Sequence, residues 1–185
     1  MRIPDFVSPW EEPGFDEWQL KLKTLPAADV GARVAQPTVE DGGWMRWIQA
    51  DSESATIHDV KFNSASIREK TVVLADIGGC PVGFCQAVTG RSLSDPLFVQ
   101  MIAVVPAARR RGVGLALLAA VASSEPARDI VMATLDGNVA ARALNEGFAR
   151  SLGLAIRRVP IRSYRRSEMG FGPGEKHRPW LIARA

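Results

Sequence analysis

The sequence has few cysteines and histidines. Only two of each occur among its 185 residues. Cys80 and Cys85 stand in apolar, strand-like sequence without a CxxC spacing, which predicts reduced, packed thiols instead of a disulfide framework. A zinc site needs more ligands than these two thiols and the distant His58 and His177 provide, so no metal centre is predicted.

Long apolar runs are also missing. Residues 1–18 contain no apolar core of signal-peptide length, and the longest apolar run, at 113–122, is about half as long as a membrane span. We therefore expect a cytoplasmic protein with no membrane contact. Repeats and low-complexity linkers are absent from the sequence, which predicts one domain over 16–185 after an N-terminal arm at 1–15 without regular structure.

Charge is unevenly distributed along the chain, although the net charge is only +3. Residues 1–106 carry 9 basic and 14 acidic side chains, a net of −5, whereas residues 107–185 carry 14 basic and 6 acidic side chains, a net of +8. The first half therefore suits a cationic partner and the second half an anionic one. An ordinary solvated surface would give the same counts.

Hydrophobic patterning in the first third gives weak signals. Alternation of apolar and polar residues over 18–25 predicts a strand, and a proline in the first turn favours a short helix over 26–36. A second helix is expected within 38–53, around Trp44, Trp47 and Ile48. The pattern from there to residue 70 is ambiguous.

The patterns become sharper after residue 70. Apolar runs at 71–77 and 81–89 on either side of Gly78–Gly79 predict a hairpin, and 96–105 a third strand. The remaining expected elements are helices over 110–123 and 138–151, strands over 130–135 and 155–164, and a closing edge strand over 180–185. This order predicts an α/β (α+β) fold: a mixed, mostly antiparallel sheet of six to seven strands with one βαβ unit, flanked by helices.

The stretch VVPAARRRGVGLALL, at 104–118, joins the end of a strand to the start of an apolar helix. The first N–H groups of a helix lack partners and carry partial positive charge, and a phosphate satisfies both deficits. Gly112 and Gly114 remove side chains that would keep a phosphate from the backbone, and the three arginines at 109–111 add charge. This turn is therefore predicted to bind a diphosphate.

Three kinds of phosphate-binding turn compete for this stretch. A P-loop needs GxxxxGK[ST], which is absent, and a dinucleotide fingerprint needs a third glycine where Leu117 stands. The third kind fits without a gap. An apolar strand, Val-x-Pro at 104–106 and Arg-x-x-Gly-x-Gly at 109–114 resemble the signature of the GCN5-related N-acetyltransferase (GNAT) superfamily.

The resemblance extends beyond this turn. Asn138, Ala141 and Leu144 stand in register with the N-x-x-A-x-x-L-Y motif that opens a later helix of the family. Weaker similarity matches 20–35 to the first strand and helix of the family and 71–89 to its second and third strands. The resemblance covers about 18–164, with strong motifs only from 97 to 145.

Membership of this family would imply one GNAT-type domain with splayed central strands and acetyl-coenzyme A as co-substrate. The pyrophosphate would lie on the backbone N–H groups of 109–115, and the pantetheine arm would pair with 102–104. A neutral amine would attack the thioester, and a backbone N–H near Val104 would stabilise the oxyanion. The implied cofactor-binding residues are Ile102, Ala103, Val104, Arg109, Arg110, Arg111, Gly112, Val113, Gly114, Leu115 and Asn138.

The sequence departs from the family at the general acid. The family has a tyrosine where this chain has Asn145, and an amide cannot act as that acid. The lone tyrosine, Tyr164, is a candidate substitute, although a packed aromatic side chain is the alternative. Ser151 and water are further candidates. A thiol leaving group hardly needs an acid, so activity could survive without one.

The general base of the family is missing as well. Histone-type members carry a glutamate on the strand that corresponds to 97–105, where Gln100 is the most polar residue here. Four carboxylates could act through water, and nothing in the sequence ranks them: Glu40, Asp41, Glu69 and Asp76. Trp44 and Trp47 could stack on a substrate or pack in the core.

The favoured function is N-acetylation of a primary amine, either a small cationic amine or a protein lysine or N-terminus. The acidic N-terminal half would attract such an acceptor through Asp29, Glu40, Asp41, Asp51 and Glu53. The missing acid and base leave a non-catalytic, coenzyme A-binding regulatory module as one alternative.

The arginines of 157–166 raise another alternative, an RNA-acting enzyme that acetylates an aminoacyl group. The same arginines could instead protect a sheet edge from aggregation. Nucleic acid is the less favoured partner. The sequence leaves open the acceptor, the length of the acyl group and the oligomeric state.

Overall fold

A seven-stranded mixed sheet forms the centre of the computed structural model, which describes residues 8–52, 56–92, 94–172, 174 and 176–184. Its strand order is β1-β2-β3-β4-β5-β7-β6. The strands are β1 (Val30–Val34), β2 (Thr71–Ile77), β3 (Cys80–Thr89), β4 (Leu97–Val104), β5 (Ile130–Leu135), β6 (Ile156–Arg158) and β7 (His177–Ile182). Only β4 and β5 pair in parallel, so the predicted fold class is confirmed.

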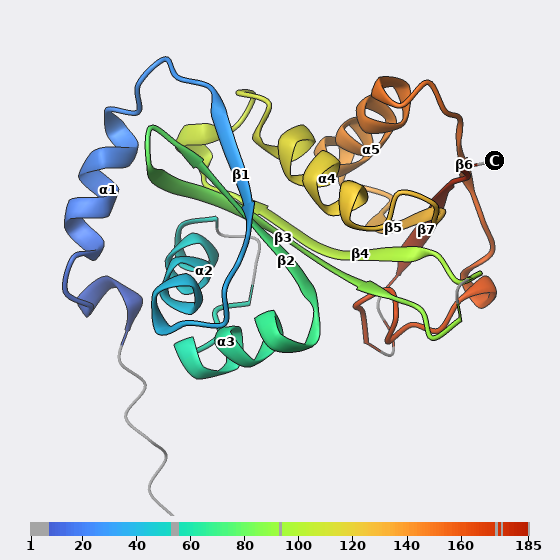
Figure 1. Ribbon diagram of the computed structural model, residues 1–185, viewed down its shortest axis with the longest axis horizontal. Helices are drawn as coiled ribbons and strands as arrows, with labels where there is room; N and C mark the ends of the chain where they lie inside the picture. The colour runs from blue at the N-terminus through green and yellow to red at the C-terminus, as the bar shows by residue number, and fades with distance from the viewer. Residues whose placement is uncertain (1–7, 53–55, 93, 173, 175, 185) are drawn as a thin grey trace, which may run out of the picture.

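Helices cover both faces of this sheet (Figure 1). The helices are α1 (Phe15–Lys23), α2 (Val39–Asp51), α3 (Val60–Glu69), α4 (Val113–Ser124) and α5 (Val139–Ser151). Figure 1 shows α2 and α3 on one face, α4 and α5 on the other, and α1 at one end of the molecule. Among the described residues, no helix combines the length and hydropathy that a membrane span requires.

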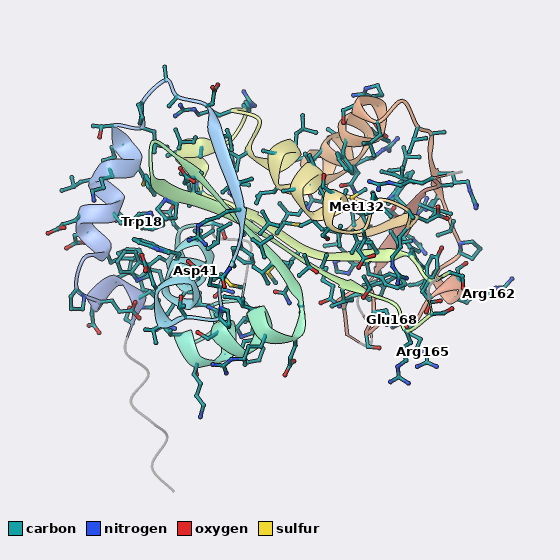
Figure 2. The ribbon with its side chains drawn as sticks, in the orientation of Figure 1. Trp18, Asp41, Met132, Arg162, Arg165 and Glu168 are labelled. Carbon is teal, nitrogen blue, oxygen red and sulfur yellow. The ribbon has the colours of Figure 1, made fainter. Side chains whose placement is uncertain are left out.

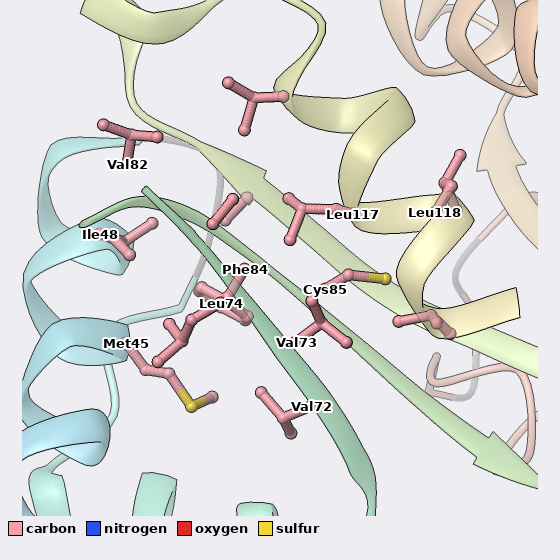
Figure 3. Packing of buried hydrophobic residues seen from close by; sticks show 14 of the residues in the cluster. Met45, Ile48, Val72, Val73, Leu74, Val82, Phe84, Cys85, Leu117 and Leu118 are labelled. Atoms are coloured by element: carbon pink, nitrogen blue, oxygen red, sulfur yellow. The ribbon is translucent and has the colours of Figure 1, made fainter. Parts of the chain in front are cut away.

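The core lies between the helices and the central strands. Figure 3 shows side chains of α2, such as Met45 and Ile48, on one side of β2 and β3, and Leu117 of α4 on the other. All three are fully buried. Cys85 is also buried within this cluster and carries a free thiol, as the sequence predicts.

The strand predicted over 18–25 is wrong, because most of these residues belong to α1. Phe15, Trp18 and Leu22 follow helical spacing and are 1, 2 and 5% exposed. Leu20, which a strand would bury on the same face as Trp18 and Leu22, is 60% exposed. The alternation of apolar residues was therefore coincidental. Pro9–Glu11 form a 3₁₀ turn, so the expected irregular arm is wrong there, and residues 1–7 lie outside the described chain.

The helix predicted over 26–36 is also wrong. These residues contain β1, which pairs antiparallel with β2 at the edge of the sheet. Gly31 allows the carboxylate of Asp76 to approach, since a Cβ at position 31 would meet Asp76 Oδ2 at 2.7 Å. Strand pairing outweighs the local composition here. Matching 20–35 to a strand followed by a helix was therefore wrong.

The middle of the chain follows the prediction closely. The expected helix within 38–53 is α2, the hairpin is β2 and β3, and the third strand is β4. The ambiguous segment before residue 70 contains α3. Asp59 caps this helix, because its Oδ1 accepts a hydrogen bond from the Phe62 N–H at 2.7 Å.

The C-terminal strands differ from the prediction. The strand expected over 155–164 ends at Arg158, and Pro160 precedes a 3₁₀ turn over Ile161–Ser163. The closing segment forms β7, which lies between β5 and β6 and is not an edge strand. β7 pairs with β5 at six positions, whereas the short β6 pairs at only three and takes the edge.

Two irregularities in β4 prepare the site. β4 pairs with β5 only at Leu97, Phe98 and Val99, after which β5 continues beside β7, so the predicted splay of the central strands is confirmed. The edge of β4 that would face β5 is therefore unpaired from Gln100 to Val104. β4 also bulges at Gln100, because Val99 pairs with Ala87 of β3 and the next pair joins Met101 to Gln86.

Candidate functional site

The turn after β4 is open at its centre. Gly112 has a φ of 81°, and apart from the adjacent residues no described atom lies within 4 Å of the position that a Cβ would take there. The helix begins at Val113, three residues later than expected, because 109–112 form the turn. Its first backbone hydrogen bond runs from the Ala116 N–H to the Gly112 carbonyl at 3.0 Å. The N–H groups of 113–115 therefore precede the hydrogen-bond ladder and suit an anion.

The three arginines of the turn differ in their surroundings. Arg109 donates to the carbonyls of Val104 at 3.3 Å and Ser52 at 3.2 Å, so it joins the end of β4 to the end of α2. Arg111 donates to the carbonyl of Pro26. Arg110 has a φ of 62° and an exposed side chain. The guanidinium of Arg110 is therefore the best placed of the three to meet an anion above the turn.

Two predicted cofactor-binding residues have clear structural roles. A Cβ on Gly114 would meet the side chain of Leu144 at 2.9 Å, so this glycine lets α4 and α5 approach each other. Asn138 caps α5, because its Oδ1 accepts a hydrogen bond from the Ala141 N–H at 3.0 Å. The asparagine-to-alanine spacing of the motif thus has a local explanation as a helix cap.

A cavity of about 450 Å³ lies beside the bulge of β4. Its walls come from α3 and its flanks, from β3 and β4, and from the segment that follows β6. The lining residues are His58, Phe62, Asn63, Lys70, Gln86, Val88, Gln100, Met101, Ser167, Glu168 and Gly170. Its volume suits a small molecule. Because Gln100 and Met101 directly precede residues 102–104, the cavity adjoins the unpaired edge of β4.

Gln100 joins two walls of this cavity. Its Oε1 accepts a hydrogen bond from Lys70 Nζ at 3.0 Å, and its Nε2 donates to the carbonyls of Ser167 at 3.1 Å and Glu168 at 2.9 Å. A Cβ on Gly170 would come within 2.7 Å of the Gln100 Cβ, so the C-terminal segment packs closely against β4. Both the bulge and this glycine are needed for the contact.

Burial shifts the pKa of two basic side chains in the cavity. It lowers the pKa of the Lys70 ammonium, and nearby Glu69 only partly offsets this. Burial also lowers the pKa of His58, with a smaller contribution from the charge of Lys70, while Asp59 acts in the opposite direction. The imidazole of His58 stacks on Phe62 at 4.1 Å and is neutral at pH 7.

An acidic residue, Glu168, also lines the cavity. Its Oε2 accepts a hydrogen bond from the Arg165 N–H at 3.1 Å, which holds the side chain in a turn. Figure 2 shows both residues at the same end of the molecule. Two residues of opposite charge, Lys70 and Glu168, therefore line the cavity on walls that Gln100 connects.

The carboxylates proposed as bases do not line this cavity. Asp41 is 3% exposed and accepts hydrogen bonds from Arg33 at 2.8 and 2.6 Å and from the Gln36 N–H at 2.6 Å. Asp76 accepts from a backbone N–H in the hairpin turn. Glu40 and Glu69 are exposed and lie outside the lining.

Two of the five carboxylates expected to form an acidic mouth, Asp41 and Asp51, have partners within the protein. Buried Asp41 forms an ion pair with half-exposed Arg33, and the hydrogen bond from Arg33 holds the pKa of this carboxyl below its usual range. Asp51 accepts a hydrogen bond from Gln19 at 3.2 Å. Glu53 lies outside the described residues.

Both tryptophans of α2 pack in the core. Trp47 contacts Trp44 with ring centroids 5.0 Å apart and Phe15 at 5.6 Å, and its Nε1 donates to Glu12 Oε2 at 2.6 Å. Neither tryptophan lines the cavity. The packing interpretation is confirmed, and stacking on a substrate is not supported.

The candidate acids are also placed away from the cavity lining. Tyr164 packs edge-on against Phe98 with centroids 5.3 Å apart, and burial raises the pKa of its hydroxyl. This placement favours packing over catalysis. Ser151 donates to the Phe148 carbonyl at 2.7 Å. Asn145 is 4% exposed, and its Nδ2 has no hydrogen-bond partner among the described residues.

Sequence reasoning missed Lys70, Glu168 and the placement of His58. Lys70 ends an ambiguous segment, and Glu168 stands in a stretch without periodicity. Gln100 offered the one usable signal, because it is a polar residue in the middle of an apolar strand.

Comparison with known proteins decides the family. The model of the acetyltransferase (GNAT) family matches residues 41–148, which is more than half of the chain. The chain belongs to this family. The acetyl-coenzyme A-dependent acetyltransferase class predicted from the motifs is thereby confirmed. The match begins at α2, after the segment in which the predicted elements were wrong.

One relative and two solved structures illustrate the similarity. The L-2,4-diaminobutyric acid acetyltransferase of Shouchella clausii (strain KSM-K16) is 34% identical over 122 residues, which cover 64% of this chain and 68% of that protein. Diaminobutyrate acetyltransferase EctA from Paenibacillus lautus, solved with L-2,4-diaminobutyric acid and coenzyme A, superposes with a TM-score of 0.65 at 21% identity over 84% of this chain and 95% of that one. The putative acetyltransferase yncA from Salmonella typhimurium, solved with acetyl-CoA, gives 0.55 at 17% identity over 83% and 91%. These two structures establish a shared fold.

Proposed function

We propose that this enzyme transfers the acetyl group of acetyl-coenzyme A to an amine of a small amino acid that carries a second amine, of the L-2,4-diaminobutyrate type. The cavity beside Gln100 carries the proposal, because two residues of opposite charge, Lys70 and Glu168, line a space of about 450 Å³. A free diamino acid has the complementary charges. The Shouchella clausii relative is an L-2,4-diaminobutyric acid acetyltransferase and the Paenibacillus lautus structure contains L-2,4-diaminobutyric acid, which supports the same class of acceptor.

The donor would occupy the turn and the unpaired edge of β4. The N–H groups of 113–115 and the guanidinium of Arg110 would hold the diphosphate. Backbone groups of 102–104 would pair with the amide-containing arm in the manner of an added strand. This path runs from the turn to the bulge at Gln100, where the cavity begins, so donor and acceptor would meet there.

Direct attack of the amine on the thioester requires few catalytic side chains. The amine nitrogen forms a bond to the acetyl carbonyl carbon, the carbon–sulfur bond breaks, and the released thiolate takes up a proton. A backbone N–H on the unpaired edge of β4 would stabilise the negative oxygen. The neutral imidazole of His58 could accept the proton of the amine through water. Leaving-group protonation can come from solvent, because a thiol has a pKa of about 8.5.

A panel of acceptors tests the proposal through release of coenzyme A thiol. We expect saturable release with L-2,4-diaminobutyrate and a lower kcat/KM with single-amine amino acids, lysine peptides and bulk aminoacyl-tRNA. Tight coenzyme A binding without turnover of any acceptor would indicate a regulatory module. Release only with aminoacyl-tRNA would indicate the RNA-acting alternative.

A further inference from the structure

Lys70 holds a fixed position between two regular elements. It is the C-cap of α3, where its backbone N–H donates to the Ser66 carbonyl at 3.0 Å, and β2 begins at the next residue. Its side chain crosses to β4 and donates to Gln100 Oε1 at 3.0 Å. The ammonium is therefore fixed at the cavity wall by structure on both sides.

The ammonium of Lys70 lines the cavity without an ion pair among the described residues, although the charge of neighbouring Glu69 acts on it. Within the described parts of the chain, no carboxylate forms an ion pair with it. Its hydrogen-bond partner, the amide of Gln100, is neutral, and an ammonium has three donors. Leaving a half-buried cation unpaired is unfavourable, so an anion supplied by a ligand would be stabilised here.

The surroundings restrict which anion fits. The cavity is small, and Glu168 lines it as well, so a highly charged anion would meet repulsion. A zwitterion that carries a carboxylate and an ammonium satisfies both lining charges. Neutral His58 adds no competing charge to this balance.

We infer that Lys70 binds the carboxylate of the acceptor and so selects amino acids over amines that lack a carboxylate. The inference rests on the proposed function, because it assigns a residue to recognition of the acceptor named there. Lys70 is a specificity-determining residue in this account. It takes no part in the bond changes at the thioester.

Two substrates that differ only in the carboxylate provide the kinetic test. Removing the carboxylate of L-2,4-diaminobutyrate gives 1,3-diaminopropane. We expect Lys70→Met to lower kcat/KM for L-2,4-diaminobutyrate by about 10- to 100-fold, mainly through KM, because one charge-assisted contact is lost. The kcat/KM of Lys70→Met for 1,3-diaminopropane should stay within about twofold of wild type. Lys70→Arg should restore part of the preference for L-2,4-diaminobutyrate over 1,3-diaminopropane. Lys61→Met, which removes an exposed lysine of α3, is the matched control.

Binding measured without turnover separates this inference from the proposed function. Calorimetric titration of L-2,4-diaminobutyrate into the enzyme saturated with coenzyme A should give heat with wild type and Lys61→Met, and much weaker binding with Lys70→Met. This pattern supports the inference even if no acetyl transfer occurs. Equal affinity in wild type and Lys70→Met, no binding by wild type, or equal loss for both amines in the kinetic assay would overturn it. Lys70→Gln replaces Lys70→Met if thermal melting shows that the latter is unfolded.

Discussion

Lys70 and Gln100, thirty residues apart in sequence, are joined by a hydrogen bond of 3.0 Å between Nζ and Oε1. The same amide donates to the carbonyl of Glu168 at 2.9 Å. Gln100 thus lies on the strand on which histone-type members of the family have a glutamate, and its amide connects two walls of a cavity. A neutral amide cannot act as a base, so its contribution here is to position the groups around the acceptor.

Replacing Gln100 with glutamate tests this role, because Gln100→Glu keeps the shape and adds a negative charge. The new carboxylate should pair with Lys70 and compete with the acceptor. It should also lose the donors to the carbonyls of Ser167 and Glu168. We expect KM for L-2,4-diaminobutyrate to rise by about tenfold or more, since a charge-assisted contact is taken away. Calorimetry should show coenzyme A affinity within twofold of wild type; a KM that does not change would contradict the positioning role.

The phosphate turn can be tested with a matched pair of substitutions at Gly112. Asparagine and aspartate both tolerate positive φ better than most residues, and they differ in charge. Apart from the adjacent residues, no described atom lies within 4 Å of the new Cβ, so both variants have room and share the same backbone strain at a φ of 81°. We expect Gly112→Asp to weaken coenzyme A binding at least tenfold more than Gly112→Asn, through repulsion of the diphosphate. Equal affinities of the two variants, measured by calorimetry at low salt, would remove the diphosphate from this turn.

The ion pair between buried Asp41 and half-exposed Arg33 predicts a pH-dependent stability. The hydrogen bond from Arg33 is the main reason why the pKa of Asp41 lies below its ordinary value of 3.8. A carboxyl whose pKa is lowered by folding contributes stability above its unfolded pKa and loses it as the pH falls through its folded pKa. Asp41→Asn should therefore lower the free energy of unfolding by about 1–3 kcal/mol at pH 7. The difference from wild type should shrink below pH 3.8, as urea titrations can measure.

Because Asp41 forms an ion pair with Arg33, reversing the charge of Asp41 and reversing that of Glu40 should have different effects. Asp41→Lys should destabilise the fold, whereas Glu40→Lys alters an exposed side chain outside the cavity lining. Glu40→Lys alone should leave KM for the amine within about twofold, because solvent and salt screen its charge. A large rise in KM for this variant would restore the acidic-mouth explanation.

Tyr164 is expected to be dispensable for the chemistry. Its ring packs against Phe98 in a second hydrophobic cluster. Tyr164→Phe keeps that contact and removes the hydroxyl, so turnover should stay within about twofold of wild type. A proton donor in the mechanism would instead contribute about 10²-fold or more. A loss of that size at unchanged coenzyme A affinity would make Tyr164 the general acid.

The sequence predicted those parts of the fold whose signals are local. The turn at 109–114, the hairpin and the asparagine cap of α5 each depend on residues within a few positions of one another. The first helix was predicted as a strand because apolar residues at 18, 20 and 22 fit a strand, whereas only 18 and 22 share one face of a helix. Only packing against α2 and the rest of the sheet distinguishes the helix from the strand.

The cavity could not be predicted for a different reason. Lys70 and Glu168 lie 98 positions apart, and the strand order brings both to the bulge at Gln100. The charge counts along the sequence were misleading, because they do not distinguish a buried carboxylate that has an ion-pair partner, such as Asp41, from one that faces solvent. Side-chain partners decide which charges a ligand meets.

A conjugate of both substrates tests the central claim, that donor and acceptor sites meet at the bulge of β4. The thiol of coenzyme A is joined through an acetyl linker to an amine of L-2,4-diaminobutyrate, and its affinity is compared with that of coenzyme A by calorimetry. If the two sites adjoin, the conjugate should bind at least tenfold more tightly than coenzyme A, because its second half binds at high effective concentration. Lys70→Met should remove most of this gain. A conjugate that binds no more tightly than coenzyme A alone would contradict the account.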